Sequence, residues 1–504
     1  MTKPVFAAAA VFAGLLCGSC GRAPSDDASL LRAAQLTRPE ALRSHAEFLA
    51  DAALEGRGIG SRGHDLAVKY LRSQFAGLGL RGGARDGGFF QRIPLRRAEV
   101  QAAGTGFVLK TERSARELFF GTDFLLMDAH GFQEGGFEGP IVFAGFGVSA
   151  GALGYDDYAG LDVKDKVVAF LSEAPTSFPA TLRACHSDHR AKRLNAAAHG
   201  ALGVIELRTP GDETRFSWPF LKRELAIGWN SVRWLESDVR PHGLDGRISF
   251  WAVLNRSGSE ALMDGENHPL DELFRAPAGQ GKPPAFPLKK NVRVRFRSRH
   301  FPLECANVVA LLEGTDPVLK NEYIVLSSHV DHLGIGGEIG GDAIYNGAWD
   351  SAAGCGILVE VARGFQAGGP KPKRSLLFLA VMGEETGVLR SEYFVQPPTV
   401  PAERIVADIN VDGGGAALFP TWTPASRAGI PPFDGLAAVR RRNTNVYHSP
   451  KDDTNQTFDY DSGARMGQFV LRLVHAFFVA SERPKWNSGD FFERRLKTTA
   501  GPAE

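Results

Sequence analysis

Cysteine is scarce in this chain. Only five of the 504 residues are cysteines, and two of them, Cys17 and Cys20, lie close to the N-terminus. The other three, Cys185, Cys305 and Cys355, are widely separated and form no C-x-x-C pair. A disulfide framework and a thiolate metal site are therefore excluded, although a single disulfide among these three remains open.

A surplus of charge of one sign is lacking too. The sequence has 58 Lys and Arg against 57 Asp and Glu, so we expect no nucleic acid partner. The apolar share of 43 % is ordinary for a soluble globular protein, and 504 residues suffice for two or three domains.

The N-terminal segment lacks an apolar run long enough to cross a bilayer. Its run from Val5 to Leu16 has about a dozen residues, whereas a spanning helix needs about 20. Lys3 precedes this run and a small-residue cleavage site follows it, which is the layout of a targeting segment. The pair Gly18-Ser19 before Cys20 resembles a bacterial lipoprotein box.

We therefore predict that residues 1–20 are a lipoprotein-type signal peptide and that Cys20 is the lipidated first residue of the mature chain. The protein would be exported and anchored in the bacterial cell envelope, at the outer membrane or the periplasmic face. Ordinary secretory cleavage, giving a periplasmic or secreted protein, is the alternative.

The sequence pattern changes twice along the chain. Apolar residues at helical spacing dominate before residue 80, short β-rich runs bounded by Gly, Pro and Asp extend from about 97 to 299, and an α/β pattern follows. We predict an α/β domain made of residues 21–96 and 300–504, with a β-rich domain, 97–299, inserted into it. The Pro- and Lys-rich stretch 277–290 indicates a linker or an exposed loop. A C-terminal amphipathic helix is expected, apolar at Met466, Phe469, Val470, Leu473, Ala476 and Phe477.

Three apolar runs of the α/β part each lead into acidic or imidazole side chains. The run 323–328 precedes His329, the run 375–381 precedes Glu384 and Glu385, and the run 404–411 precedes Asp412. Open α/β sheets place their ligand sites outside the carboxyl ends of the strands. This recurrence favours a metal site over the ordinary readings of each part, which are a capping pair, a solvated charge pair or, for Asp350, a helix N-cap.

The side chains available there suit zinc chemistry. Zinc binds imidazole nitrogen and carboxylate oxygen, and a two-metal site needs about five such ligands and an unligated base. Neighbouring residues that leave a strand point in opposite directions, so one of the two glutamates could bind metal while the other moves protons. The candidate ligands are His329, Asp350, Glu385, Asp412 and His448. The Gly- and Arg-rich loop 54–65 lacks the lysine and the preceding strand of a phosphate-binding P-loop, so we do not expect a phosphate site in it.

Five segments carry a family resemblance. HVDHLG, IYNGAWDSAAG, AVMGEETGVLRSEYF, INVDGG and YHSPKDD resemble, in this order, the motifs of the co-catalytic zinc peptidases of clan MH. That clan includes bacterial leucyl aminopeptidases and, as relatives, the glutamate carboxypeptidase and transferrin-receptor branch. Residues 49–80 resemble the N-terminal region of these enzymes, and the block 97–299 is similar to the protease-associated domain often inserted in them.

The resemblance implies a mixed β-sheet flanked by helices and hydrolysis of N-terminal peptide bonds, with peptide or protein N-termini as substrates. Glu384 would be the general base, and Asp331 would be the carboxylate that orients a ligand histidine. Two Zn²⁺ ions per chain would be held by His329 and Asp412 on one ion, Glu385 and His448 on the other, and Asp350 bridging both.

The chain departs from this family in two places. Trp349 stands where many relatives have an additional Asp, and only 36 positions (448 − 412) separate Asp412 from His448, where relatives have more chain. The shortened segment indicates an altered substrate pocket. It leaves one alternative open, a peptidase-like binding or scaffolding protein without turnover. A glutaminyl cyclase-like enzyme with one zinc is a further alternative, which Asp350 and the inserted domain disfavour.

Overall fold

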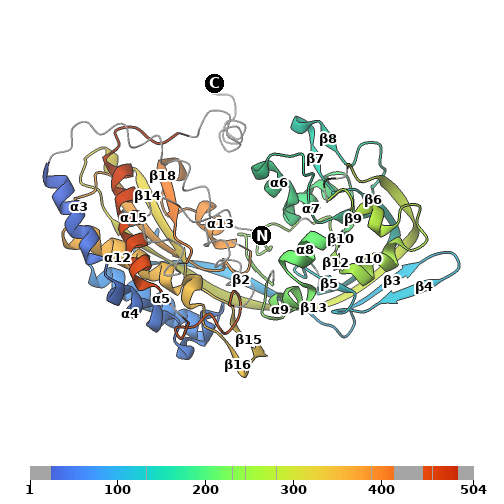
Figure 1. Cartoon of the computed structure of the whole chain (residues 1–504), viewed down its shortest axis with the longest axis horizontal. Helices are drawn as coiled ribbons and strands as arrows, with labels where there is room; N and C mark the ends of the chain where they lie inside the picture. The colour runs from blue at the N-terminus through green and yellow to red at the C-terminus, as the bar shows by residue number, and fades with distance from the viewer. Residues whose placement is uncertain are drawn as a thin grey trace, which may run out of the picture.

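Two long strands, β2 (Phe90–Val100) and β13 (Ala285–Leu312), connect two lobes of the molecule (Figure 1). The computed structural model describes residues 24–485 apart from 132, 230, 245, 278, 280, 388, 414–445 and 457. We call the lobe that contains both ends of the described chain the first lobe. The lobe formed by the residues between β2 and β13 is the second lobe.

The first lobe is built on a mixed sheet in which three strands run parallel. β14 (Tyr323–His329) lies between β18 (Ile405–Asn410) and β17 (Ser375–Val381), while β13 pairs antiparallel with the far side of β17. β14 and β17 are almost wholly buried, as apolar parallel strands usually are. The three predicted runs are therefore neighbouring parallel strands, and their carboxyl ends meet at one edge of the sheet.

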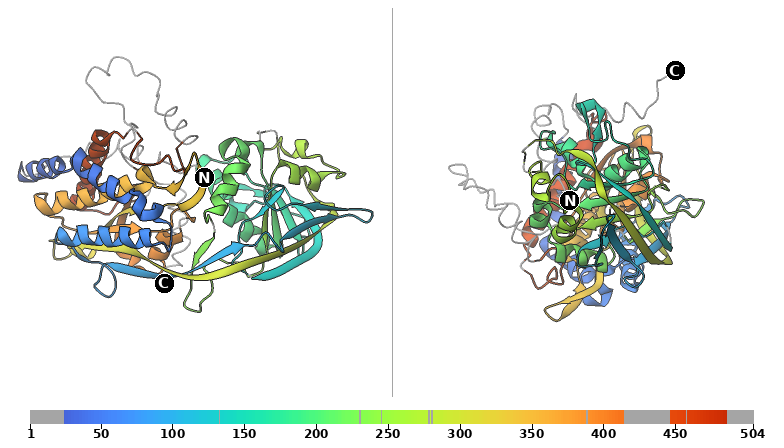
Figure 2. Two further views of the ribbon diagram at one scale, coloured as in Figure 1. Left: turned by 90° about the horizontal axis from the view of Figure 1, so that it is seen from below. Right: turned by 90° about the vertical axis from the view of Figure 1, so that its right-hand side faces the viewer.

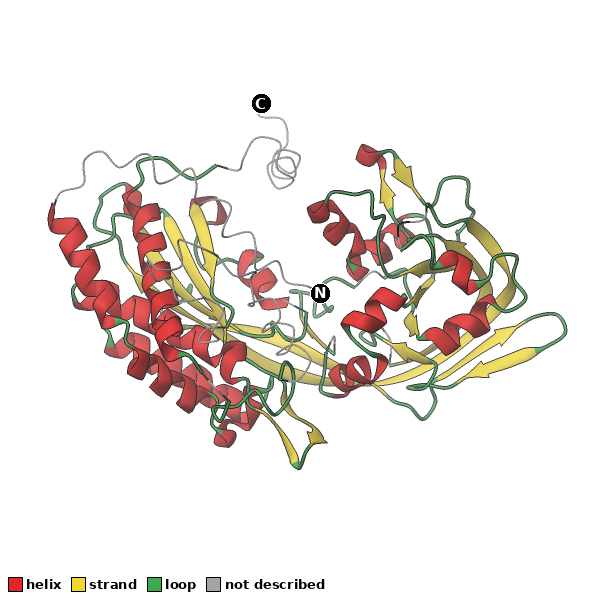
Figure 3. Cartoon of the chain, viewed as in Figure 1, coloured by secondary structure: helices red, strands yellow, loops and turns green. Residues whose placement is uncertain are grey.

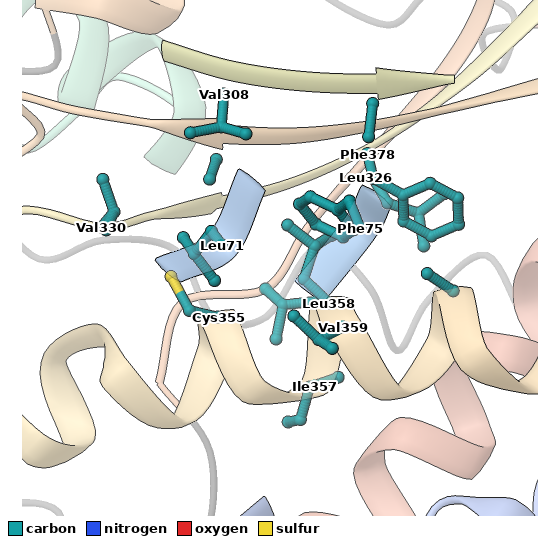
Figure 4. Packing of buried hydrophobic residues seen from close by; sticks show 14 of the residues in the cluster. Leu71, Phe75, Val308, Leu326, Val330, Cys355, Ile357, Leu358, Val359 and Phe378 are labelled. Atoms are coloured by element: carbon teal, nitrogen blue, oxygen red, sulfur yellow. The ribbon is translucent and has the colours of Figure 1, made fainter. Parts of the chain in front are cut away.

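Helices pack against both faces of this sheet, which confirms the predicted mixed sheet flanked by helices (Figure 3). Figure 4 shows Leu358 and Val359 close to Phe75 and Phe378, between helix and sheet. On the opposite face Phe394 of α13 (Leu389–Val395) packs against the sheet. The helices of the larger core are α3 (Pro24–Leu36), α4 (Pro39–Leu49), α5 (Arg62–Gly77), α12 (Gly354–Ala367) and α15 (Tyr460–Val479).

The second lobe has its own cores, one on each face of a mixed sheet whose central strands are parallel. Its strands β6 (Glu134–Ala144), β9 (Val167–Leu171), β10 (Gly203–Leu207) and β12 (Trp251–Leu254) pair in this order and in parallel. β9, β10 and β12 fall within the predicted β-rich block, and β6 does so as well but begins at Glu134, before the apolar part of its run. The described part of the lobe also contains helices, so its pattern is α/β: α6 (Ala180–Ser187), α7 (His189–Ala198), α8 (Pro210–Arg215), α9 (Trp218–Ala226), α10 (Arg256–Met263) and α11 (Leu270–Leu273).

β13 belongs to both lobes, as its unbroken course along their base shows (Figure 2). Its first part pairs with β6, and its later part pairs with β2 and then β17. The predicted domain bounds at 97 and 299 therefore fall inside β2 and β13. The loop predicted for 277–290 is wrong from Ala285 onward, because alternate residues there are buried and the bulge after Pro287 lets the ladder continue.

None of the helices in the described ranges is long and apolar enough to cross a membrane. The predicted signal peptide, residues 1–20, lies outside the described residues. The remaining elements include β1 (Arg81–Gly82), β3 (Gly106–Lys110), β4 (Ala115–Leu118), β5 (Phe124–Leu126), β7 (Ser149–Ala150), β8 (Tyr155–Asp156), β11 (Val232–Trp234), β15 (Gly334–Ile339), β16 (Asp342–Tyr345), η1 (Ala52–Arg57) and η4 (Ala348–Ala353).

Candidate metal centre

The carboxyl edge of the first-lobe sheet brings three of the predicted ligands together. His329 ends β14, and its Nε2 lies 2.9 Å from Oδ1 of Asp350 and 3.3 Å from Oδ1 of Asp412, which follows β18. His329 and Asp350 are buried, and Asp412 is partly open to solvent. His329 and Asp412 are 83 positions apart (412 − 329) and meet because β14 and β18 are neighbouring parallel strands, while Asp350 lies in η4, directly before α12.

The other two predicted ligands meet on the opposite side of Asp350. His448 Nε2 lies 3.0 Å from Oε2 of Glu385 and 3.7 Å from Oδ2 of Asp350. One oxygen of Asp350 therefore faces His329 and the other faces His448. This is the arrangement that a carboxylate bridging two cations requires.

Asp350 occupies this position because the side chain of Asp452 holds its backbone through hydrogen bonds. Its φ and ψ of −109° and 83° are not helical, and Asp452 accepts hydrogen bonds from the backbone N–H of Trp349 and of Asp350 at 3.0 and 3.2 Å. The N-cap residue of α12 is Ala353, which makes no side-chain capping bond. Asp350 is therefore not an N-cap, and the ordinary reading of an acidic residue before a helix does not apply to it.

Arg57 holds two loops of the site in place. Its guanidinium is fully buried and donates to the carbonyls of Val330 at 2.8 Å, Asn346 at 2.6 Å and Gly347 at 2.9 Å, and also to that of Leu49. Burial lowers the pKa of Arg57. Because the donors of Arg57 all point at backbone carbonyls, this residue of the Gly- and Arg-rich loop supports the backbone around the site.

Glu384 and Asp331 lie next to the ligands. His329 Nδ1–H donates to the backbone carbonyl of Asp331 at 3.0 Å, while the Asp331 carboxylate lies 3.9 Å from Nδ1 and accepts from the N–H of Glu384 at 3.4 Å. Ligand atoms of His329, Glu384 and Glu385 lie within 4.8 Å of one another. The expectation that the two glutamates point in opposite directions is therefore wrong, because they stand in a turn beyond the end of β17.

Charge holds this cluster in an ionised state. Burial alone lowers the pKa of His329, but contacts with Asp350 and Asp412 outweigh it and raise that pKa well above its usual value. The pKa of His448 is raised in the same way, against burial, by Glu385 and Glu224. For Glu385, burial is outweighed by His448 and His332, and the pKa falls well below its usual value. A cation bound here would displace the protons of the histidines.

The donor set fits a pair of metal ions. Both carboxylate oxygens of the buried Asp350 lack a well-aligned hydrogen-bond donor in the described part of the chain, and the imidazoles of His329 and His448 are the charges that face them, a role that bound cations could take over. Two of the three candidate ligand groups share Asp350, one completed by His329 and Asp412 and the other by His332 and Glu385. Imidazole nitrogens with carboxylate oxygens are the ligands that zinc takes in catalytic sites.

Several residues of the site are not singled out by the sequence reasoning. His332 Nδ1 lies 2.8 Å from Glu385, and the motif HVDH carries a signal for it. Asp452 belongs to the motif YHSPKDD, and Arg57 to the loop considered above. Glu224, from the second lobe, contacts His448, and no pattern in the sequence marks it.

A cavity of about 240 Å³ adjoins the centre where the two lobes meet. His332, Glu385 and Thr386 line it from the first lobe, and Ile227 and Trp229 from the second. It provides room for a small organic group beside the candidate ligands. The predicted shortening between 412 and 448 falls almost wholly on residues 414–445, which lie outside the described residues.

Comparisons with known proteins agree with this site. Residues 307–421 match the model of Peptidase family M28, a family of clan MH zinc peptidases, so the predicted resemblance is confirmed. Aminopeptidase NAALADL1 of Mus musculus is 28% identical over 286 residues, 49% of this chain and 36% of that protein. A "Probable zinc metalloprotease" of Pyrenophora teres f. teres (strain 0-1) is 34% identical over 113 residues, 22% of this chain and 23% of that protein.

The aligned regions thus span about a third or less of the length of these relatives. Among solved structures, the aminopeptidase from Aneurinibacillus sp. strain AM-1 has a TM-score of 0.51 and 16% sequence identity, covering 91% of this chain and 100% of that chain. At this identity the likeness shows a shared fold.

Proposed function

We propose that this chain, which carries a Peptidase family M28 domain at residues 307–421, is a di-zinc exopeptidase that removes residues from the N-termini of peptides. The observation that carries the proposal is Asp350, whose two oxygens face His329 and His448 at 2.9 and 3.7 Å. An arrangement of this kind suits two cations better than one. Action at the N-terminus is supported by the name of the relative from Mus musculus, an aminopeptidase.

Each residue has a task in this proposal. His329 and Asp412 would hold one ion, Glu385 and His448 the other, and Asp350 both. Zinc bound here would supply Lewis-acid polarisation of the scissile carbonyl and would lower the pKa of water.

Glu384 would act as general base. Its carboxylate would take a proton from the attacking water as the C–O bond forms, and would pass that proton to the leaving amine as the C–N bond breaks. Glu384 is suited to this because its backbone N–H is fixed by Asp331 while its side chain is less buried than that of Glu385.

The substitution Glu384→Gln tests the proposal. It keeps the size of the side chain and removes the base, so kcat on aminoacyl-anilides and dipeptides should fall by about 10²- to 10⁴-fold while zinc content by mass spectrometry stays near two per chain. Glu338→Gln, at an exposed position of β15, is the control and should change neither quantity.

Other results would favour the alternatives. A wild-type protein that binds two zinc ions but turns over none of the substrates would indicate a binding or scaffolding protein. One zinc per chain together with cyclisation of N-terminal glutamine would indicate the cyclase-like enzyme. Protein without any bound zinc after zinc addition would end the proposal.

We also propose that the protein is exported and anchored to the bacterial envelope through a lipidated Cys20, and that the second lobe is a protease-associated domain. The targeting segment supports export and anchoring. The segments 145–168 and 197–207, where the sequence most resembles a protease-associated domain, support the assignment of the second lobe. Cell fractionation of wild-type protein and Cys20→Ser tests the anchor: the wild type should sediment with membranes and the variant should not.

A further inference from the structure

Helix α9 of the second lobe reaches the candidate metal centre in the first lobe. Trp218 and Leu221 bury one side of α9 in a core of the second lobe, and Trp218 Nε1–H donates to the carbonyl of Gly121 at 3.2 Å. Glu224 lies one turn further on the same side of the helix and is buried, at 3 % exposure. Its carboxylate therefore cannot turn to solvent, and it lies where the lobes meet.

Glu224 contacts the predicted zinc ligand His448. The Nδ1–H of His448 donates to Oε2 of Glu224 at 2.5 Å, with the carboxylate oxygen as acceptor. The other ring nitrogen, Nε2, then faces Glu385 at 3.0 Å and Asp350 at 3.7 Å. A hydrogen bond at one nitrogen determines which nitrogen of an imidazole is left for a metal.

His448 needs such support more than the other histidine ligand does. His329 is part of a buried strand, whereas His448 stands in a turn and has a φ of +51°, in the left-handed region that non-glycine residues seldom adopt. Its ring is stacked on Tyr447 at 3.8 Å between centroids and lies nearly parallel to Phe220 of α9 at 6.1 Å. Two of the contacts that orient this ring, those with Glu224 and Phe220, thus come from α9.

We propose that Glu224 is a positioning residue of the metal centre, which fixes the Nδ1–H tautomer and the direction of His448, so that the second lobe completes the zinc site of the first. This inference rests on the proposed function, because it takes His448 to be a zinc ligand. The affected ion is the one held by Glu385 and His448. The ion held by His329 and Asp412 is linked to His448 only indirectly, through the shared Asp350, whose Oδ2 lies 3.7 Å from His448 Nε2.

Zinc affinity of the full chain under Glu224→Gln tests the inference. Gln keeps the size of the side chain but removes the charge that stabilises the Nδ1–H bond, and loss of such a partner typically weakens metal affinity by about 10- to 100-fold. Titration against a chromophoric chelator should show one zinc ion weakened by this factor and the other unchanged. The matched control is Glu206→Gln, a buried glutamate of the same lobe that pairs with His189 Nδ1 at 2.9 Å, and both affinities should stay at the wild-type values.

The outcomes separate this inference from the proposed function. If the wild type binds two zinc ions and Glu224→Gln binds both with wild-type affinity, the inference fails while the proposed function stands. If the wild type binds no zinc, both fail. Equal weakening of both ions would indicate a general structural effect and would also overturn the inference. Should Glu224→Gln not fold, Glu224→Asp replaces it: the shortened carboxylate keeps its charge, and selective weakening of one ion is again expected.

Discussion

Removal of the buried Arg57 guanidinium should destabilise the first lobe and its metal centre together. Arg57→Met keeps most of the volume of the side chain and deletes every donor. The backbone carbonyls of Leu49, Val330 and Asn346 then lose the donor that satisfies them, while the carbonyl of Gly347 keeps the N–H of Ala352 at 3.2 Å.

The size of the effect follows from two opposing contributions. A buried carbonyl left without a donor costs about 1–3 kcal/mol, so three of them could cost about 3–9 kcal/mol. Removing the guanidinium also removes the free-energy cost of burying its charge, a burial that lowers the pKa of Arg57, and this offsets several kcal/mol of the loss. We therefore expect the free energy of unfolding to fall by about 3–5 kcal/mol, a large part of the 5–15 kcal/mol that is typical of folded proteins.

Urea unfolding of the zinc-free protein, followed by far-UV circular dichroism, measures this loss. Arg62→Met is the control, because Arg62, at the start of α5, is exposed. Its removal should change the free energy of unfolding by less than about 0.5 kcal/mol. Arg57→Lys keeps a charge but has fewer donors and should fall between wild type and Arg57→Met. A loss below about 1 kcal/mol for Arg57→Met would refute the reasoning that these four bonds hold the loops.

Two further predictions concern stability away from the metal ligands. Gly63→Ala in α5 places a Cβ 1.6 Å from the carbonyl oxygen of Leu54 and should lower the free energy of unfolding by about 3 kcal/mol or more. In the control Gly77→Ala, in the same helix, the added Cβ meets no described atom within 4 Å, and stability should change by less than about 1 kcal/mol. Thermal melting of both variants measures the difference. Burial lowers the pKa of His130 to about 3, against about 6.5 in an unfolded chain. Between these two pH values the unfolded chain binds a proton that the folded chain does not, so the free energy of unfolding falls as the pH falls. From pH 7 to 4.5 the wild type should lose about 2–3 kcal/mol more of this free energy than His130→Phe, as measured by urea unfolding. Equal losses in the two proteins would contradict this prediction.

The strand ends of the first lobe can be predicted from the sequence because the signal there is local. A buried parallel strand needs a continuous apolar run, and the residue after the run must lie at the sheet edge. This reasoning alone locates His329, Glu385 and Asp412. The apolar run of β17 does not, however, predict the directions of the side chains in the turn that follows it. The predicted directions of Glu384 and Glu385 are wrong for this reason.

Helix α15 shows a different limit. The helix is predicted and present, but its buried side contains Gly467, Leu471 and Val474, while Phe469, expected in the apolar stripe, is 39 % exposed. Both sides of this helix carry apolar residues, so periodicity alone does not select the side that packs. Small residues decide it, because Gly467 lets the helix come close to Thr37, where an added Cβ would lie 2.6 Å from the methyl group.

The contact between Glu224 and His448 joins residues 224 positions apart and depends on how two lobes meet, which no local pattern encodes. The structure gives a physical reason why this meeting is well defined. β2 and β13 remain paired in one antiparallel register from Phe90↔Val308 to Val100↔Ser298, so the connection between the lobes is a hydrogen-bonded ladder. A ladder of this length resists the bending that a Gly- or Pro-rich linker would allow.

Side-chain contacts of α13 also hold the two lobes together. Glu392 of α13 accepts from Arg190 at 2.8 Å and lies 3.1 Å from His242 Nε2, both of the second lobe. Ladder and ion pairs together hold α9 against the turn of His448. A carboxylate supplied by another lobe can orient a metal ligand only if the lobes do not move apart, and this molecule meets that condition at two separate places.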